Sequence, residues 1–193
     1  MVEEYGKNGG VKMGIEETLS YINSGLKESM PPEKADSITD TLYKLFERTR
    51  ARGTPIVDFL EFLRTETDWL KASSPKEGMP LIEYSVNVAK ELLEIKGNEG
   101  ADVDDESCVV VGLFHEIGLV KIDSEGFEEI KGEDPEVRSM RLASRSLRII
   151  ARYVPLTPEE AQAILYHDVQ DIPVKRLKLT ELLQKAVEKV MGS

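Results

Sequence analysis

The chain has 193 residues and a formal net charge of −11, with 40% hydrophobic and 32% charged residues. This composition is typical of a soluble globular protein with one core, and the excess of acids opposes nonspecific binding to nucleic acid. The longest apolar run, residues 109–114, is too short to cross a membrane. A single cysteine and the lack of an apolar signal segment lead us to expect a cytoplasmic location.

Helical periodicity dominates the first half of the chain. Residues 1–14 are polar and rich in glycine, which predicts a flexible tail. Apolar residues at helical spacing predict a pair of antiparallel helices in residues 15–53, interrupted by two prolines. Pro55 and Pro80 then mark the first turns of two further helices, which are separated by a loop at residues 73–78.

The middle of the chain contains one ambiguous segment. Residues 109–114 are apolar on every side and fit a helix or a buried strand. We favour a helix, because no other segment offers a partner strand and an isolated strand leaves its backbone groups without hydrogen bonds. Residues 121–132 are acidic and contain glycines, which indicates a loop.

Three helices are predicted after this loop. Asp134 begins a long helix that ends near Tyr153, and residues 179–190 form an amphipathic helix at the end of the chain. Between them, Thr157 and Glu160 have the spacing of a capping box, which is the clearest helix start in the sequence. The expected fold is therefore an all-α, multi-helix bundle.

Each of the two histidines is followed directly by a carboxylate, in His115-Glu116 and in His167-Asp168. Imidazole and carboxylate are ligands that zinc, iron and manganese accept, so two pairs from separate segments can close one metal site. The alternative is that His115 is a core histidine at the end of an apolar run and that His167 caps a helix end.

Arginines recur at steps of three and four residues along the helix that starts after Asp134: Arg138, Arg141, Arg145, Arg148 and Arg152. All five fall within a sector of about 80°. We expect the opposite face to meet the core; it contains Met140, Ala143, Leu147, Ile150 and Val154. Leu142 and Ile149 flank the stripe, where exposed apolar side chains would suit a partner surface.

This arginine stripe has two interpretations. A planar guanidinium grips phosphate with two hydrogen bonds, so the stripe can bind an anionic ligand or an acidic protein partner. The ligand-binding candidates are Arg138, Arg141, Arg145 and Arg148. Alternatively, nearby acids neutralise the stripe within the protein; these are Asp123, Glu125, Glu128, Glu129, Glu133 and Asp134.

Three segments together resemble the HD-domain metal-dependent phosphohydrolases, in particular their bacterial and phage branch. They are Ile-Glu-Tyr-Ser-Val-Asn-Val-Ala at 82–89, Val-Val-Val-Gly-Leu-Phe-His-Glu-Ile-Gly at 109–118, and the stretch at 149–167 that ends in Ile-Leu-Tyr-His. The resemblance covers residues 54–190. It implies an all-helical fold in which histidines and aspartates hold one or two divalent metals that activate water against a phosphate ester. It makes residues 54–193 an HD-domain-like domain, with residues 15–53 as a helical N-terminal extension.

The chain also departs from the family pattern. Tyr84 stands where the first metal histidine would be, Glu116 replaces the aspartate of the His-Asp pair, and Leu142 falls where this branch often has another histidine. A phenol titrates near 10, so Tyr84 is a poor ligand at neutral pH. Where the family has a metal-binding aspartate in its last helix, this chain offers Gln184, Lys185, Ala186 and Val187.

Two hypotheses follow. In the favoured one, the chain is a degenerate HD-domain-like protein without catalysis or a bound cofactor, which acts as a binding or interaction module. In the other, a rearranged site of His115, Glu116 and His167 holds one divalent metal, with Glu116 as the catalytic carboxylate and Asp168 as a further possible ligand. Arg145 would then clamp the phosphate of a nucleotide or another phosphate ester.

Overall fold

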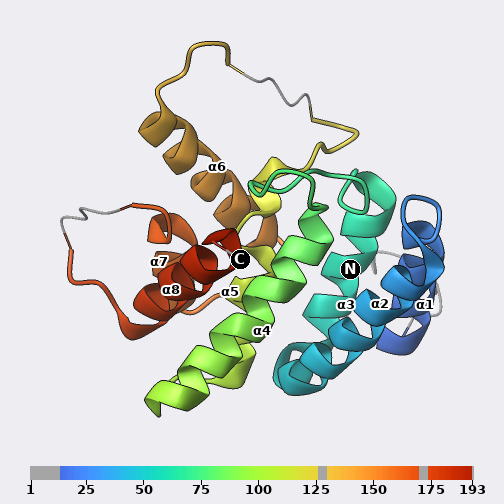
Figure 1. The fold of residues 1–193 in the computed structure, drawn as a ribbon, viewed down its shortest axis with the longest axis horizontal. Helices are drawn as coiled ribbons and strands as arrows, with labels where there is room; N and C mark the ends of the chain where they lie inside the picture. Colours follow the sequence, from blue (N-terminus) through green and yellow to red (C-terminus); the bar gives the residue numbers. More distant parts are fainter. Residues whose placement is uncertain (1–13, 126–129, 170–173, 193) are drawn as a thin grey trace, which may run out of the picture.

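Helices make up nearly all of the regular structure. The computed structural model describes residues 14–125, 130–169 and 174–192. Within these ranges the chain forms eight α-helices and two short 3-10 segments, with no strand (Figure 1). The predicted all-α bundle is confirmed. The tail predicted at residues 1–14 lies outside the described residues apart from Gly14.

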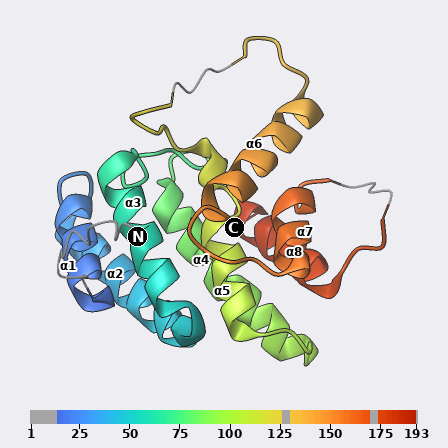
Figure 2. The same cartoon turned by 180° about the vertical axis from the view of Figure 1, so that it is seen from behind.

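The first three α-helices lie together on one side of the molecule (Figures 1 and 2). They are α1 (Ile15–Leu26), α2 (Pro32–Phe46) and α3 (Gly53–Glu66), with the 3-10 segment η1 (Glu47–Arg52) joining the last two. Helix α1 packs against α2 and α3 through its apolar face. The pair of helices predicted in residues 15–53 is present as α1 and α2.

Two helices form the centre of the bundle. Helix α4 (Leu81–Glu99) packs against α5 (Asp105–Phe114), and the predicted helix at residues 109–114 is confirmed as part of α5. The two backbones approach closely at Gly112, where an added Cβ would lie 2.6 Å from the Cα of Ala89. After its acidic first turn, α5 is buried on every side, because α4, η1 and the last two helices cover it.

The remaining helices lie on the opposite side of α4 and α5 (Figures 1 and 2). They are α6 (Pro135–Ile150), α7 (Pro158–Tyr166) and α8 (Lys178–Gly192), and the 3-10 segment η2 (Ile117–Leu119) lies against α6. Asp134 accepts hydrogen bonds from the first turn of α6, and the predicted capping box of Thr157 and Glu160 is present at α7.

The buried face of α6 differs from the prediction. Leu142 and Ile149, which the sequence placed beside the arginines as exposed residues, are 5% and 0% exposed. Of the predicted core residues, Ala143, Ile150 and Val154 are buried, whereas Met140 and Leu147 are only partly buried. The buried face of α6 is therefore shifted from the predicted face toward the arginines, because η2 and α7 both pack against that side of the helix.

A buried carboxylate joins the first helices to the rest of the bundle. Glu160 at the start of α7 is fully buried and accepts two hydrogen bonds from the Arg52 guanidinium, at 2.9 and 2.7 Å. Ser107 of α5 donates a third at 2.7 Å. Burial alone would raise the pKa of Glu160, but the hydrogen bonds from Arg52 and Ser107 lower it below its usual value. One ionised group thus connects η1, α5 and α7.

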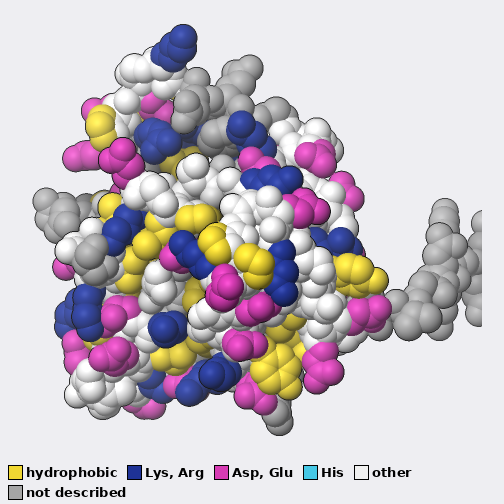
Figure 3. Space-filling model, turned by 45° about the vertical axis from the view of Figure 1, so that its right-hand side comes forward, with side chains coloured by type: hydrophobic (Ala, Val, Ile, Leu, Met, Phe, Trp, Pro, Cys, Tyr) yellow, Lys and Arg dark blue, Asp and Glu magenta, His cyan; other side chains and the backbone are white. Residues whose placement is uncertain are grey.

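The surface mixes both signs of charge. Acidic and basic side chains alternate over the face drawn in Figure 3, and apolar side chains appear between them. Among the described residues, no helix is both long enough and apolar enough to span a membrane.

Replacing Arg52 by Leu should destabilise the protein strongly. The change leaves the buried Glu160 carboxylate without its charged partner, which costs about 3 kcal/mol in the free energy of unfolding. The matched control is Arg48→Leu, because Arg48 pairs with Asp105 at the surface and such pairs contribute at most about 1 kcal/mol. Urea unfolding followed by circular dichroism measures both. Equal losses in the two variants would show that Glu160 does not depend on Arg52.

Candidate metal centre

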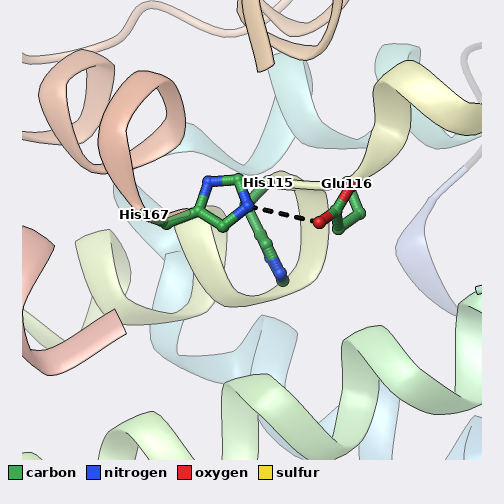
Figure 4. A group of neighbouring side chains, drawn as sticks. All are labelled: His115, Glu116 and His167. Carbon is green, nitrogen blue, oxygen red and sulfur yellow. Dashed lines mark hydrogen bonds and ion pairs between the residues drawn. The ribbon is translucent and has the colours of Figure 1, made fainter. Parts of the chain in front are cut away.

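Two helix ends bring the predicted metal ligands together. His115 directly follows the last residue of α5, and Glu116 occupies the turn between α5 and η2. His167 directly follows the last residue of α7. Figure 4 shows the two imidazoles and the carboxylate converging from these ends.

The three side chains form one cluster. One ligand atom from each of His115, Glu116 and His167 lies within 4.8 Å of the other two. His167 Nε2 is 3.2 Å from Glu116 Oε1, and the two imidazole rings meet edge to face at 4.9 Å. Both histidines are buried, while the Glu116 side chain keeps 15% of its surface exposed. The cluster is therefore buried on the histidine side and reachable at the carboxylate.

Backbone hydrogen bonds fix the tautomer of both histidines. His115 Nδ1 lies 3.1 Å from the carbonyl oxygens of Val111 and Gly112, and His167 Nδ1 lies 2.9 Å from that of Ile164. A carbonyl only accepts, so each Nδ1 carries a proton. The Nε2 of neutral His115 therefore keeps its lone pair, whereas His167 Nε2 donates to the Glu116 carboxylate when no metal is bound. Metal-binding histidines are held in this way.

His115 Nε2 is the unusual atom of the cluster. It is buried and has no hydrogen-bond partner among the residues that the structure describes. A buried polar atom without a partner loses its hydration without compensation, which is rare in proteins. A divalent cation would accept this lone pair. The donor set of two imidazoles and one carboxylate therefore fits such an ion.

Burial and charge interactions shift the pKa values of the two histidines in opposite directions. Burial and the charge of His167 lower the pKa of His115 from 6.5 to about 4. Burial also opposes the charge on His167, but the hydrogen bond and charge of Glu116 outweigh it and raise its pKa. For Glu116, burial opposes ionisation, and the hydrogen bond from His167 outweighs it and lowers the pKa. His115 is therefore neutral at pH 7 and ready to bind a cation.

A polar cavity of about 910 Å³ opens beside the cluster. Glu116 and His167 lie in its wall, together with Arg138, Lys71 and Lys121. Asp168 also lines it but is exposed and accepts a hydrogen bond from Ser139 at 2.7 Å, so it lies outside the three-residue cluster. The cavity wall thus carries these three cations beside the candidate ligands, together with the carboxylates of Asp68, Glu133 and Asp168.

Three arginines of the predicted stripe approach acids that precede α6. Arg141 makes two hydrogen bonds to Glu133, and Arg148 and Arg152 both approach Glu125. The neutralising acids proposed from the sequence thus include Glu125 and Glu133, whereas Glu128 and Glu129 lie outside the described residues. Of the four ligand-binding candidates, only Arg138 lines the cavity beside the cluster.

Arg145 supports the turn that carries Glu116. Its guanidinium donates hydrogen bonds of 2.6 Å to the carbonyl oxygens of Gly118 and Val120. Ser146 Oγ accepts a hydrogen bond from the Gly118 amide at 2.7 Å, and an added Cβ on Gly118 would lie 2.2 Å from the carbonyl oxygen of Leu142. From the sequence, Arg145 was the candidate for clamping a phosphate. In the structure, its guanidinium binds backbone carbonyl oxygens.

The positions that depart from the HD pattern are also near the cluster. Tyr84 is fully buried on α4, with its ring 5.9 Å from that of His115. Its burial, with the charges of Glu116 and Asp168, raises the pKa of the phenol. On α8, Gln184 donates hydrogen bonds to the carbonyl oxygens of Tyr166 and Val169. From the sequence, Tyr84 was only a residue that replaces a metal-binding histidine. The hydrophobic periodicity of a helix does not reveal where a tyrosine hydroxyl lies in the fold.

No protein-family model, curated protein or solved structure matches this chain.

The pKa of His115 predicts acid sensitivity of the metal-free protein. The pKa is lower in the folded state, so the unfolded chain takes up this proton first as the pH falls. His115 therefore leaves the free energy of unfolding unchanged above pH 6.5. Between pH 6.5 and 4 its titration lowers the free energy of unfolding by about 3 kcal/mol. His115→Gln should lack this part of the loss in urea unfolding with chelator present. His167→Gln should retain most of it, because the pKa of His167 is shifted upward. An identical pH profile for wild type and His115→Gln would contradict the assignment.

Arg145→Met should cost more stability than Arg148→Met. The first change removes two charge-assisted hydrogen bonds to backbone carbonyls, for a loss of about 2 kcal/mol. Arg148 is 60% exposed and only approaches Glu125 at 3.6 Å, so its replacement should cost at most about 0.5 kcal/mol. Thermal unfolding of the two variants tests this difference, and the reverse order would exclude a supporting role for Arg145.

Proposed function

We propose that this protein is a metal-dependent phosphohydrolase acting on a phosphate ester, with one divalent cation held by His115, Glu116 and His167. One observation carries the proposal: the buried His115 Nε2 has no partner among the described residues, and a nitrogen of the same ring lies within 4.8 Å of ligand atoms of His167 and Glu116. This arrangement supports the second of the two hypotheses formed from the sequence. The HD-domain resemblance points to the same chemistry.

The number of protein ligands supports catalysis. Structural zinc sites use four protein ligands, whereas catalytic sites use three and keep a position for water or substrate. His115, Glu116 and His167 supply three, and the wall of the 910 Å³ cavity includes two of them. A divalent cation bound there supplies an activated water and polarises a phosphoryl oxygen.

Three cationic side chains of the cavity wall can meet an anionic substrate. Arg138, Lys71 and Lys121 line the cavity among the carboxylates of Asp68, Glu133 and Asp168, and the charge of Arg138 adds a small contribution to the lowered pKa of Glu116, after that of His167. A guanidinium binds phosphate oxygens with two parallel hydrogen bonds. We assign the clamping role to Arg138, in place of Arg145, whose guanidinium holds the η2 turn.

A second candidate is a binding module that captures a phosphate-bearing ligand without hydrolysing it. Two observations favour it. Tyr84 replaces the first family histidine, and Gln184 on α8 binds backbone carbonyls in the region where the family has a metal-binding aspartate. Such a module would keep the cavity and its cations and lack turnover.

The decisive test measures metal and phosphate release together. Wild-type protein purified without chelator should contain about one divalent metal per chain and release phosphate from a panel of nucleotides and phosphate esters. Glu116→Gln should weaken zinc binding at least about tenfold and abolish turnover, since losing a ligand exceeds the effect of losing an outer hydrogen bond. Glu159→Gln, an exposed change on α7, is the matched control and should behave as wild type.

Metal without turnover under any divalent cation would favour the binding module. No stoichiometric metal in the wild type, together with no zinc uptake in equilibrium dialysis, would refute the metal centre itself.

A further inference from the structure

The candidate metal centre contains a second buried polar atom without a partner. The Tyr84 hydroxyl is inaccessible to solvent and has no hydrogen-bond partner within the described part of the chain, like His115 Nε2. The two rings are neighbours, with centroids 5.9 Å apart. Two such atoms on neighbouring side chains lead us to look for one bound group that interacts with both.

The two atoms have complementary chemistry. A phenol with a pKa near 10 or above carries its proton at neutral pH, so the Tyr84 hydroxyl is available as a donor. His115 Nε2 offers a lone pair, because its Nδ1 proton is directed to backbone carbonyls. A cation can take the lone pair, and an oxygen atom bound to that cation can accept the phenol proton. One of these atoms alone would not call for both a cation and an oxygen atom bound to it.

From this complementarity we infer that the Tyr84 hydroxyl donates a hydrogen bond to the oxygen, from water or phosphate, at the open position of the cation. The inference rests on the proposed function. It gives Tyr84 a role in holding the oxyanion, which differs from metal coordination. The position on the rigid, buried face of α4 fixes the ring, which favours a precise donor.

The test compares Tyr84→Phe, which removes only the hydroxyl oxygen, with Tyr153→Phe as the control. Tyr153 stacks on Phe62 and contacts Phe59, away from the cluster. Three quantities are measured: the urea midpoint of the metal-free protein, zinc affinity by chelator competition, and the affinity of the zinc-loaded protein for inorganic phosphate.

For Tyr84→Phe we expect an unchanged or higher urea midpoint, because the lost hydroxyl has no hydrogen-bond partner among the described residues. Zinc affinity should stay within about threefold, and the dissociation constant for phosphate should rise about tenfold, as expected for losing one hydrogen bond to a charged group. Tyr153→Phe should leave zinc and phosphate binding unchanged.

Two results would overturn the role of Tyr84 while the proposed function stands. One is phosphate binding equal to wild type in zinc-loaded Tyr84→Phe. The other is a lower urea midpoint in the metal-free variant, which would show that the hydroxyl has a partner in the absence of metal. Failure of the wild type to bind zinc would refute both the inference and the proposed function.

Discussion

The geometry of the candidate centre depends on an interaction at the far ends of the helices that carry it. Glu160 accepts hydrogen bonds from Arg52, Ser107 and the Thr157 amide, and it is fully buried. Ser107 lies in the first turn of the helix that leads to His115, and Glu160 lies in the first turn of the helix that leads to His167. Each helix rises about 1.5 Å per residue, so this clamp acts roughly 10 to 12 Å from the cluster. Fixing both starting points fixes where both helix ends meet.

The sequence predicts the local elements well, because their signals are local. The capping box of Thr157 and Glu160 and the helix at residues 109–114 are both present. The contact from Arg52 to the same Glu160 spans 108 residues and leaves no periodic signature. A capping residue that also neutralises a distant arginine can be recognised only once the chain is folded.

The orientation of α6 was the least predictable feature. Its apolar residues include Leu142 and Ile149 on one side and Met140 and Leu147 on the other, so periodicity leaves two possible faces. Packing by η2 and α7 selects the face with Leu142, and this choice turns Arg145 onto the backbone of Gly118 and Val120. The grouping of His115, Glu116 and His167 followed from the adjacent His-acid pairs and the HD-domain resemblance. The Nε2 of His115 and the hydroxyl of Tyr84, which have no partner in the described part of the chain, can be recognised only in the folded protein.

Both histidines directly follow the last residue of an α-helix, α5 in one case and α7 in the other. The peptide dipoles of a helix sum to about half a negative elementary charge at its C-terminus. Two such ends converge on the cluster, so the backbone itself creates a negative potential there, to which the Glu116 carboxylate adds. A cation entering this region would be attracted before any ligand bond forms, and an anionic group would be repelled until the cation had arrived. Under the proposed function, the polypeptide scaffold would therefore favour binding of the positive ion before that of the phosphate.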